Sequence, residues 1–95
     1  MWNVKIHKRA LKNLIKLPIS IQERFKAFTI ELKVLGPIQN RWPNFGKIQG
    51  TENCYHCHLK KGKPTYVVVW KVTGRMIVEV TYIGTHEKAH YRRFC

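Results

Sequence analysis

The sequence predicts an α+β domain: an N-terminal strand and two helices, then a three-stranded antiparallel meander, forming one sheet with the helices packed on one face. Apolar residues recur every second position at the start and again after residue 53, and every three to four positions in between. Two helices before a run of strands favour α+β over a doubly wound parallel sheet. The 95 residues, 44% of them hydrophobic, suffice for one core, so we expect a single domain over residues 1–95.

The first strand and the first helix follow from a change of period. Trp2, Val4 and Ile6 alternate with polar residues, as in a strand with one buried face. From His7 the apolar residues share one helical face until Pro18 ends the pattern. The opposite face of this predicted short helix is basic and carries Lys8, Arg9, Lys12 and Lys16.

The second helix is predicted from Ser20 to Leu35. Ser20 and Glu23 have the spacing of a capping box, and Gly36-Pro37 supplies an end. The apolar side chains in between recur every three or four residues, at Ile21, Phe25, Phe28, Leu32 and Leu35. We expect this stripe to pack on the sheet; the alternative is that it binds a partner helix.

Three strands are predicted after an irregular connection over residues 36–53. They cover Cys54–Lys60, Thr65–Val72 and Arg75–Ile83. Short connections at residues 61–64 and 73–74 favour antiparallel hairpins. We interpret Trp42 and Trp70 as packing residues.

The charge balance predicts a polyanionic partner. Eighteen Lys and Arg residues oppose five acidic ones, which gives a net charge of +13. Nucleic acid, an anionic membrane surface or an acidic protein fit this charge. The longest apolar run, Tyr66 to Trp70, is far below the roughly 20 residues of a membrane span, and no signal-peptide pattern precedes it. We therefore expect a cytoplasmic protein without a membrane partner.

The cysteines raise two further expectations. Cys54, Cys57 and Cys95 cannot all pair within one chain, and cytosolic thiols stay reduced, so we expect no structural disulfide. Cys54 and Cys57 have the spacing of half a zinc site. In a strand, however, these two side chains lie on opposite faces, and no second pair of ligands follows. We therefore expect no metal and no cofactor.

A row of cationic side chains is predicted along one face of the strand from Cys54 to Lys60. His56, His58 and Lys60 recur at two-residue steps, and Lys61 and Lys63 extend the row into the turn. Imidazoles titrate near neutral pH, so this row can hold phosphates and exchange protons. The alternative is a solvated sheet face with scattered histidines.

The last ten residues combine basic and aromatic groups. They include His86, His90, Tyr91, Arg92 and Arg93. Aromatic rings among guanidinium groups favour unstacked RNA bases and their phosphates. A solvated basic tail is the alternative.

Four segments together resemble the RelE/ParE superfamily, the toxins of type II toxin–antitoxin systems, over almost the whole chain. They are Lys47-Ile-Gln-Gly, Tyr55-x-x-x-Leu-Lys60, Pro64-Thr-Tyr-Val-Val-Val-Trp70 and Tyr82-Ile-Gly-Thr-His-Glu87. The resemblance implies a RelE-like fold and an endoribonuclease, an mRNA interferase. Such an enzyme cuts messenger RNA, often on the ribosome, without a metal ion, inhibits translation and is silenced by a cognate antitoxin. We expect that antitoxin to be acidic.

Family positions carry over to four residues. Two family lysines fall on His56 and His58, a family arginine falls on His86, and the tyrosine that stacks on the substrate base falls on Tyr91. A further family arginine falls on Val67, so the resemblance implies that another cation stabilises the phosphate. Lys60, Lys63, Arg92 and Arg93 are the candidates.

Metal-free RNA cleavage fits these residues chemically. It needs a base for the 2′-hydroxyl, cations around the phosphate and an acid for the departing 5′ oxygen, and leaves a 2′,3′-cyclic phosphate and a 5′-hydroxyl. Three alternatives stay open: a non-enzymatic ParE-like gyrase inhibitor, a passive RNA-binding module and a structural ribosome-associated protein.

Overall fold

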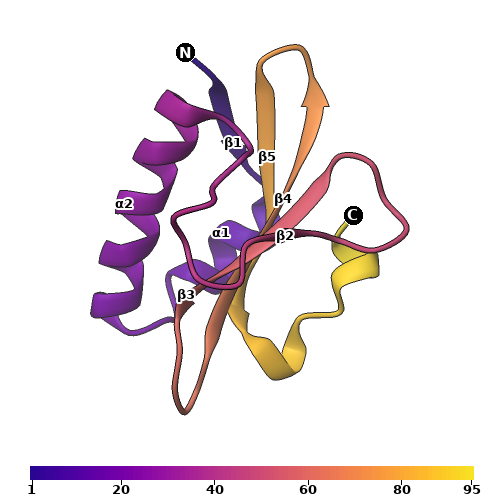
Figure 1. The fold of residues 1–95 in the computed structure, drawn as a ribbon. Helices are drawn as coiled ribbons and strands as arrows, with labels where there is room; N and C mark the ends of the chain where they lie inside the picture. Colours follow the sequence, from indigo (N-terminus) through magenta and orange to yellow (C-terminus); the bar gives the residue numbers. More distant parts are fainter.

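The computed structural model describes residues 1–95 and has the predicted α+β class, with all strands in one sheet (Figure 1). Its elements in chain order are β1 (Asn3–Ile6), α1 (Lys8–Leu14), α2 (Ile19–Leu35), β2 (Gly46–Lys47), β3 (Cys54–Lys60), β4 (Tyr66–Gly74), β5 (Ile77–Thr85) and the 3-10 helices η1 (His86–Lys88) and η2 (Tyr91–Phe94). None of the helices combines the length and the apolar character that crossing a bilayer requires.

The sheet has the strand order β1-β5-β4-β3-β2. β3, β4 and β5 form the predicted antiparallel meander, whereas β1 joins its far edge parallel to β5, with Asn3 opposite Ile77. β2 lies inside the segment that the sequence predicted as irregular. Its two residues are extended because they pair with Tyr55 and His56, and two residues are too few to show a period.

One face of the sheet packs against α2 and forms the helix-side core. Phe28, Leu32 and Trp70 are fully buried there. The Phe28 ring lies 5.4 Å from Trp42 and 5.0 Å from Trp70, and the Trp70 indole N–H donates to the Pro37 carbonyl at 3.0 Å. The predicted packing roles of Trp42 and Trp70 are confirmed.

The start of α2 differs from the prediction. The helix begins at Ile19, one residue before Ser20, with Pro18 as its N-cap and no side-chain capping bond. The Pro18 carbonyl instead accepts from the backbone N–H groups of Ile21 and Gln22. Ser20 therefore lies within the first turn, where a capping box cannot form. Leu35 is 51% exposed, so the buried stripe ends at Leu32.

The opposite face of the sheet carries a smaller group of buried residues, the tail-side core, partly covered by η1, η2 and their connection. Its members are Ile48, Cys54, Val67, Val69, Tyr82 and Phe94. In Figure 1 the yellow segment that ends the chain lies across the sheet from α2. The Phe94 ring stacks on Tyr82 at 4.6 Å.

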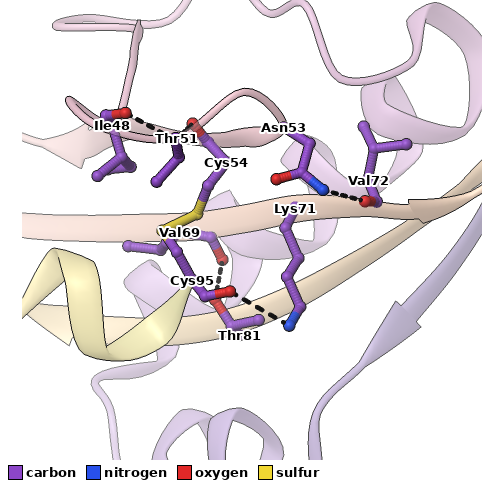
Figure 2. Close-up of a disulfide and its surroundings, with 9 residues drawn as sticks. All are labelled: Ile48, Thr51, Asn53, Cys54, Val69, Lys71, Val72, Thr81 and Cys95. Carbon is purple, nitrogen blue, oxygen red and sulfur yellow. Dashed lines mark hydrogen bonds between the residues drawn. A yellow bond between two sulfur atoms is a disulfide. The ribbon is translucent and has the colours of Figure 1, made fainter.

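The expectation of no structural disulfide is wrong: Cys54 and Cys95, 41 residues apart, are bonded to each other (Figure 2). The two 3-10 helices turn the chain back over β3, which places the Cα of Cys95 5.8 Å from that of Cys54. An odd number of cysteines requires only that one stays free, and this one is Cys57, buried in the helix-side core.

Candidate functional site

β3 presents His56 and His58 on the tail-side face, as the two-residue period predicted. Their ring centroids are 6.5 Å apart. Cys57 and Leu59 point the other way, into the helix-side core. The zinc interpretation of Cys54 and Cys57 fails on the same geometry, since Cys54 is disulfide-bonded and Cys57 lies across the sheet. No three His, Cys, Asp or Glu side chains converge in a way that would hold a metal ion.

The segment after β5 brings two more rings to these histidines. Tyr91, from η2, lies 4.8 Å from the His56 ring, and His86, from η1, lies 5.6 Å from the His58 ring. His86 and Tyr91 are themselves 6.3 Å apart. We call His56, His58, His86 and Tyr91 the ring cluster. Two segments that are distant in the sequence thus form one continuous surface.

The sheet beneath the ring cluster is apolar. His56 pairs with Val69 and His58 with Val67, and residues paired across antiparallel strands share a face. Both valines are fully buried. β4 therefore contributes no cation at position 67, and any charge that contacts a phosphate here must come from the surrounding segments.

Three polar atoms of the ring cluster have no hydrogen-bond partner within the protein. They are Nδ1 of His56, Nδ1 of His58 and the phenolic oxygen of Tyr91, and all three are shielded from solvent. Buried polar groups are normally paired, because an unpaired one costs free energy. Unpaired buried groups therefore call for a physical reason, and a catalytic role is one of those that proteins show.

Burial also sets the protonation of the cluster. It lowers the pKa of His56, and the charge of His86 lowers it further. The pKa of His58 is lowered chiefly by burial, and then by the charges of His86, His56 and Lys61. Burial raises the pKa of Tyr91. At neutral pH, His56 and His58 thus favour the uncharged form that accepts a proton, and Tyr91 stays a phenol.

The predicted cations lie around the cluster in different ways. Lys61 acts electrostatically on His58, and Arg92 and Arg93 are exposed on η2 directly after Tyr91. Lys63 is exposed in the β3–β4 turn. The predicted row does not continue to Lys60, because a register shift after His58 pairs Lys60 with Tyr66, which belongs to the helix-side core.

A basic cavity of about 590 Å³ lies beside α1 and was not predicted as a site. It has no acidic lining residue and is lined by His7, Lys8, Arg9, Lys12, Asn13, Lys16, Tyr82, Lys88 and Phe94. The Arg9 guanidinium lies 5.0 Å from the centroid of the Phe94 ring. The signal for this cavity in the sequence is the four-residue spacing of Lys8, Lys12 and Lys16. That spacing by itself predicts only a basic helix face. No member of the ring cluster lines this cavity.

Comparison with known proteins finds relatives among RelE toxins, although no family model matches the chain. A Methanocaldococcus jannaschii protein named toxin RelE1 is 36% identical over 69 residues, which are 73% of this chain and 76% of that protein. The RelE–RelB complex of Pyrococcus horikoshii OT3 contains a similar chain, with a TM-score of 0.73 and 25% identity, covering 93% of this chain and 98% of the other. The intact RelBE toxin–antitoxin complex of E. coli also contains a similar chain. Its TM-score is 0.70 and its identity 24%, and the match covers 93% of this chain and 100% of the other.

Proposed function

This chain belongs to the RelE family of toxins, and we propose that it is the toxin of a type II toxin–antitoxin system and cleaves messenger RNA without a metal ion. The observation that carries the proposal is the ring cluster. Three imidazoles and a phenol lie within 4.8 to 6.5 Å of a neighbouring ring, on a protein of net charge +13.

The first chemical step is removal of a proton from the ribose 2′-hydroxyl. A neutral imidazole performs this step, and the lowered pKa values of His56 and His58 keep both rings neutral at physiological pH. The 2′ oxygen then attacks the phosphorus while the bond to the 5′ oxygen breaks. The products are a 2′,3′-cyclic phosphate and a 5′-hydroxyl.

The other groups act on the charge and on the base. Another imidazole of the cluster gives a proton to the departing 5′ oxygen. Lys61, Arg92 and Arg93 offset the charge that develops on the phosphate, and Lys60 and Lys63 bind the flanking backbone. Tyr91 positions a base by stacking.

The test is cleavage of a defined messenger RNA by the purified chain, with the RNA free or bound to ribosomes. We expect cut ends that carry the cyclic phosphate and the 5′-hydroxyl, unchanged by EDTA and absent when the ribose at the cleavage site is 2′-deoxy. Loss of cleavage in EDTA would contradict the mechanism. Inhibition of DNA supercoiling by gyrase without any cut RNA would favour a ParE-like inhibitor, and binding without either activity would favour a passive RNA-binding module.

We further propose that an acidic antitoxin binds this chain, as the RelE–RelB and RelBE complexes of its structural neighbours suggest. The charge of +13 is self-repelling, and an acidic partner relieves it. α2 also exposes aliphatic side chains that a partner can cover, with Ile30 54% and Val34 58% exposed.

Co-expression with the neighbouring open reading frame tests this partner. We expect a small acidic protein to co-purify and to dissociate more readily as salt concentration rises, because salt screens the attraction. Recovery of the chain alone from its native operon would contradict the proposal.

A further inference from the structure

We propose that the disulfide between Cys54 and Cys95 is a positioning element of the ring cluster: it holds Tyr91 against His56, and its reduction by a dithiol slows RNA cleavage while the sheet stays folded. The rate measurement rests on the proposed function. The position of Tyr91 over His56 does not depend on that function.

The segment that carries Tyr91 is weakly attached by its backbone. His86 donates its N–H to the Thr65 carbonyl at 2.9 Å. Beyond His86, every backbone hydrogen bond of the segment closes a local turn, such as Arg93 to His90 and Cys95 to Arg92. No ladder of hydrogen bonds therefore fixes residues 87–95 to the sheet.

Ala89 and Tyr91 themselves pack against the tail-side core, and further attachments lie after Tyr91 in the chain. Phe94 stacks on Tyr82, the Lys71 ammonium donates to the Cys95 carbonyl at 3.5 Å, and Cys95 is covalently bound to Cys54. Tyr91 makes no hydrogen bond through its own hydroxyl. Apart from the packing against the tail-side core, its position over His56 depends on anchors three and four residues further along.

The Cys54 end of the bond is held by hydrogen bonds of the neighbouring residues, some of which Figure 2 draws. The Cys54 carbonyl accepts from the Ile48 N–H at 2.8 Å. The side-chain amide of Asn53 donates to the Val72 carbonyl at 2.9 Å, and the Thr51 hydroxyl donates to the Ile48 carbonyl at 2.6 Å. Because Cys54 opens β3, two residues before His56, the bond ties Tyr91 to the strand that holds its neighbour.

Reduction is chemically simple. A thiolate of the dithiol attacks the sulfur of Cys95, because the Cys95 residue is partly exposed whereas Cys54 is fully buried. The bond between the two protein sulfurs breaks, and the Cys54 sulfur leaves and takes a proton. The second thiol of the reductant then displaces Cys95, which leaves two protein thiols and an oxidised, cyclic reductant. Cys57 does not replace either partner, since it lies in the helix-side core and burial raises the pKa of its thiol.

The first experiment compares the oxidised protein, the same protein reduced with dithiothreitol, and the Cys95→Ser variant. We expect kcat for RNA cleavage to fall about 10-fold to 100-fold in the reduced protein and in the variant, since a small misplacement of a positioning group has effects of that order. Far-ultraviolet circular dichroism should keep the signal of the folded sheet. Dithiothreitol should not change the variant further, and this is the matched control. Equal rates with and without the reductant would overturn the proposal.

A double-mutant cycle tests whether the disulfide acts through Tyr91. In a Tyr91→Ala background, Cys95→Ser should change kcat less than about twofold, because the group that the bond positions is already absent. An undiminished effect of Cys95→Ser in that background would show a merely structural role and overturn the assignment.

A spectroscopic readout separates this inference from the proposed function. In the oxidised protein the Tyr91 ring, 4.8 Å from the His56 ring, should shift the NMR signals of the His56 imidazole, and reduction should move these signals toward those of the Tyr91→Ala variant. His56 signals that stay unchanged on reduction overturn the positioning role even if RNA is cleaved. A shift without cleavage in any form supports the positioning role and contradicts the ribonuclease.

Discussion

The two faces of the sheet differ in the number of residues they bury and in the elements that cover them. The helix-side core gathers thirteen buried residues, among them Phe28 and Trp70, beneath a 17-residue helix. The tail-side core has six, and its cover is two short 3-10 helices and a disulfide. All the unpaired buried side-chain polar atoms belong to the ring cluster on the tail-side face. The helix-side face thus supplies most of the stability. The tail-side face loses some stability, because it holds buried polar atoms without hydrogen-bond partners.

The largest expected effect concerns the tail-side face. Replacing His56, His58 or His86 by Ala should slow RNA cleavage by about 10²-fold to 10⁴-fold, the usual contribution of a positioned proton-transfer group. The free energy of unfolding should change little, since none of the three is fully buried. Cleavage rates and denaturant unfolding of each variant measure the two effects.

His90→Ala is the matched control for these variants, because His90 is exposed and lies outside the ring cluster. It should cleave at the wild-type rate. Undiminished toxicity on overexpression of a variant with all three histidines replaced would contradict the assignment of chemistry to this face.

The second prediction concerns the helix-side face. Phe28→Ala should lower the free energy of unfolding by about 3 to 5 kcal/mol, because Phe28, on α2, is fully buried against Trp42 and Trp70. Thermal and denaturant unfolding measure the loss. Ile30→Ala, on the exposed side of the same helix, should have a far smaller effect. An unchanged melting temperature for Phe28→Ala would show that this face is not the stabilising one.

The third prediction concerns binding at the ring cluster. Tyr91→Ala should weaken the binding of single-stranded RNA by about 1 to 3 kcal/mol and relax the sequence preference, because a base loses its stacking partner. Tyr91→Phe keeps the ring and should keep most of the affinity. Affinities for a 2′-deoxy substrate analogue check this, and equal losses in both variants would point to the hydroxyl rather than the ring.

The smallest expected effect is on the pH dependence of stability. Burial lowers the pKa of His56 and His58 below the ordinary value of 6.5, so the unfolded chain binds protons more readily than the folded one. Their contribution to stability is complete above pH 6.5 and is lost as the pH falls through the lowered folded-state values. Denaturant unfolding at about pH 7.5 and pH 5 should show this loss. Replacing both residues by Gln should reduce it, and His90→Gln should not.

The sequence predicted the helix-side face better than the other one, for a physical reason. Periodicity reports which residues a regular element buries, and it identified Phe25, Phe28 and Leu32 on α2 and the common face of His56 and His58 on β3. The tail-side cover has no period, because η1 and η2 are single turns. The sequence therefore contains no signal for the pairing of Cys95 with Cys54. The prediction of no disulfide followed instead from the expected reducing conditions of the cytoplasm.

Local register explains the remaining differences at the site. Alternation placed Lys60 with His58, but the irregularity after His58 ends that alternation. His86 and Tyr91 were assigned through family resemblance, and the structure brings their rings next to those of His58 and His56.

The parallel pairing of β1 with β5 affects when this protein can fold during its synthesis on the ribosome. β1 is translated first, but it pairs with β5, residues 77–85. Its backbone therefore has no strand to hydrogen-bond with until most of the chain has been translated. Sheets with such distant contacts fold late and slowly. The ring cluster is completed later still, once Tyr91 has been translated. A nascent chain therefore lacks a complete ring cluster until Tyr91 has left the ribosome.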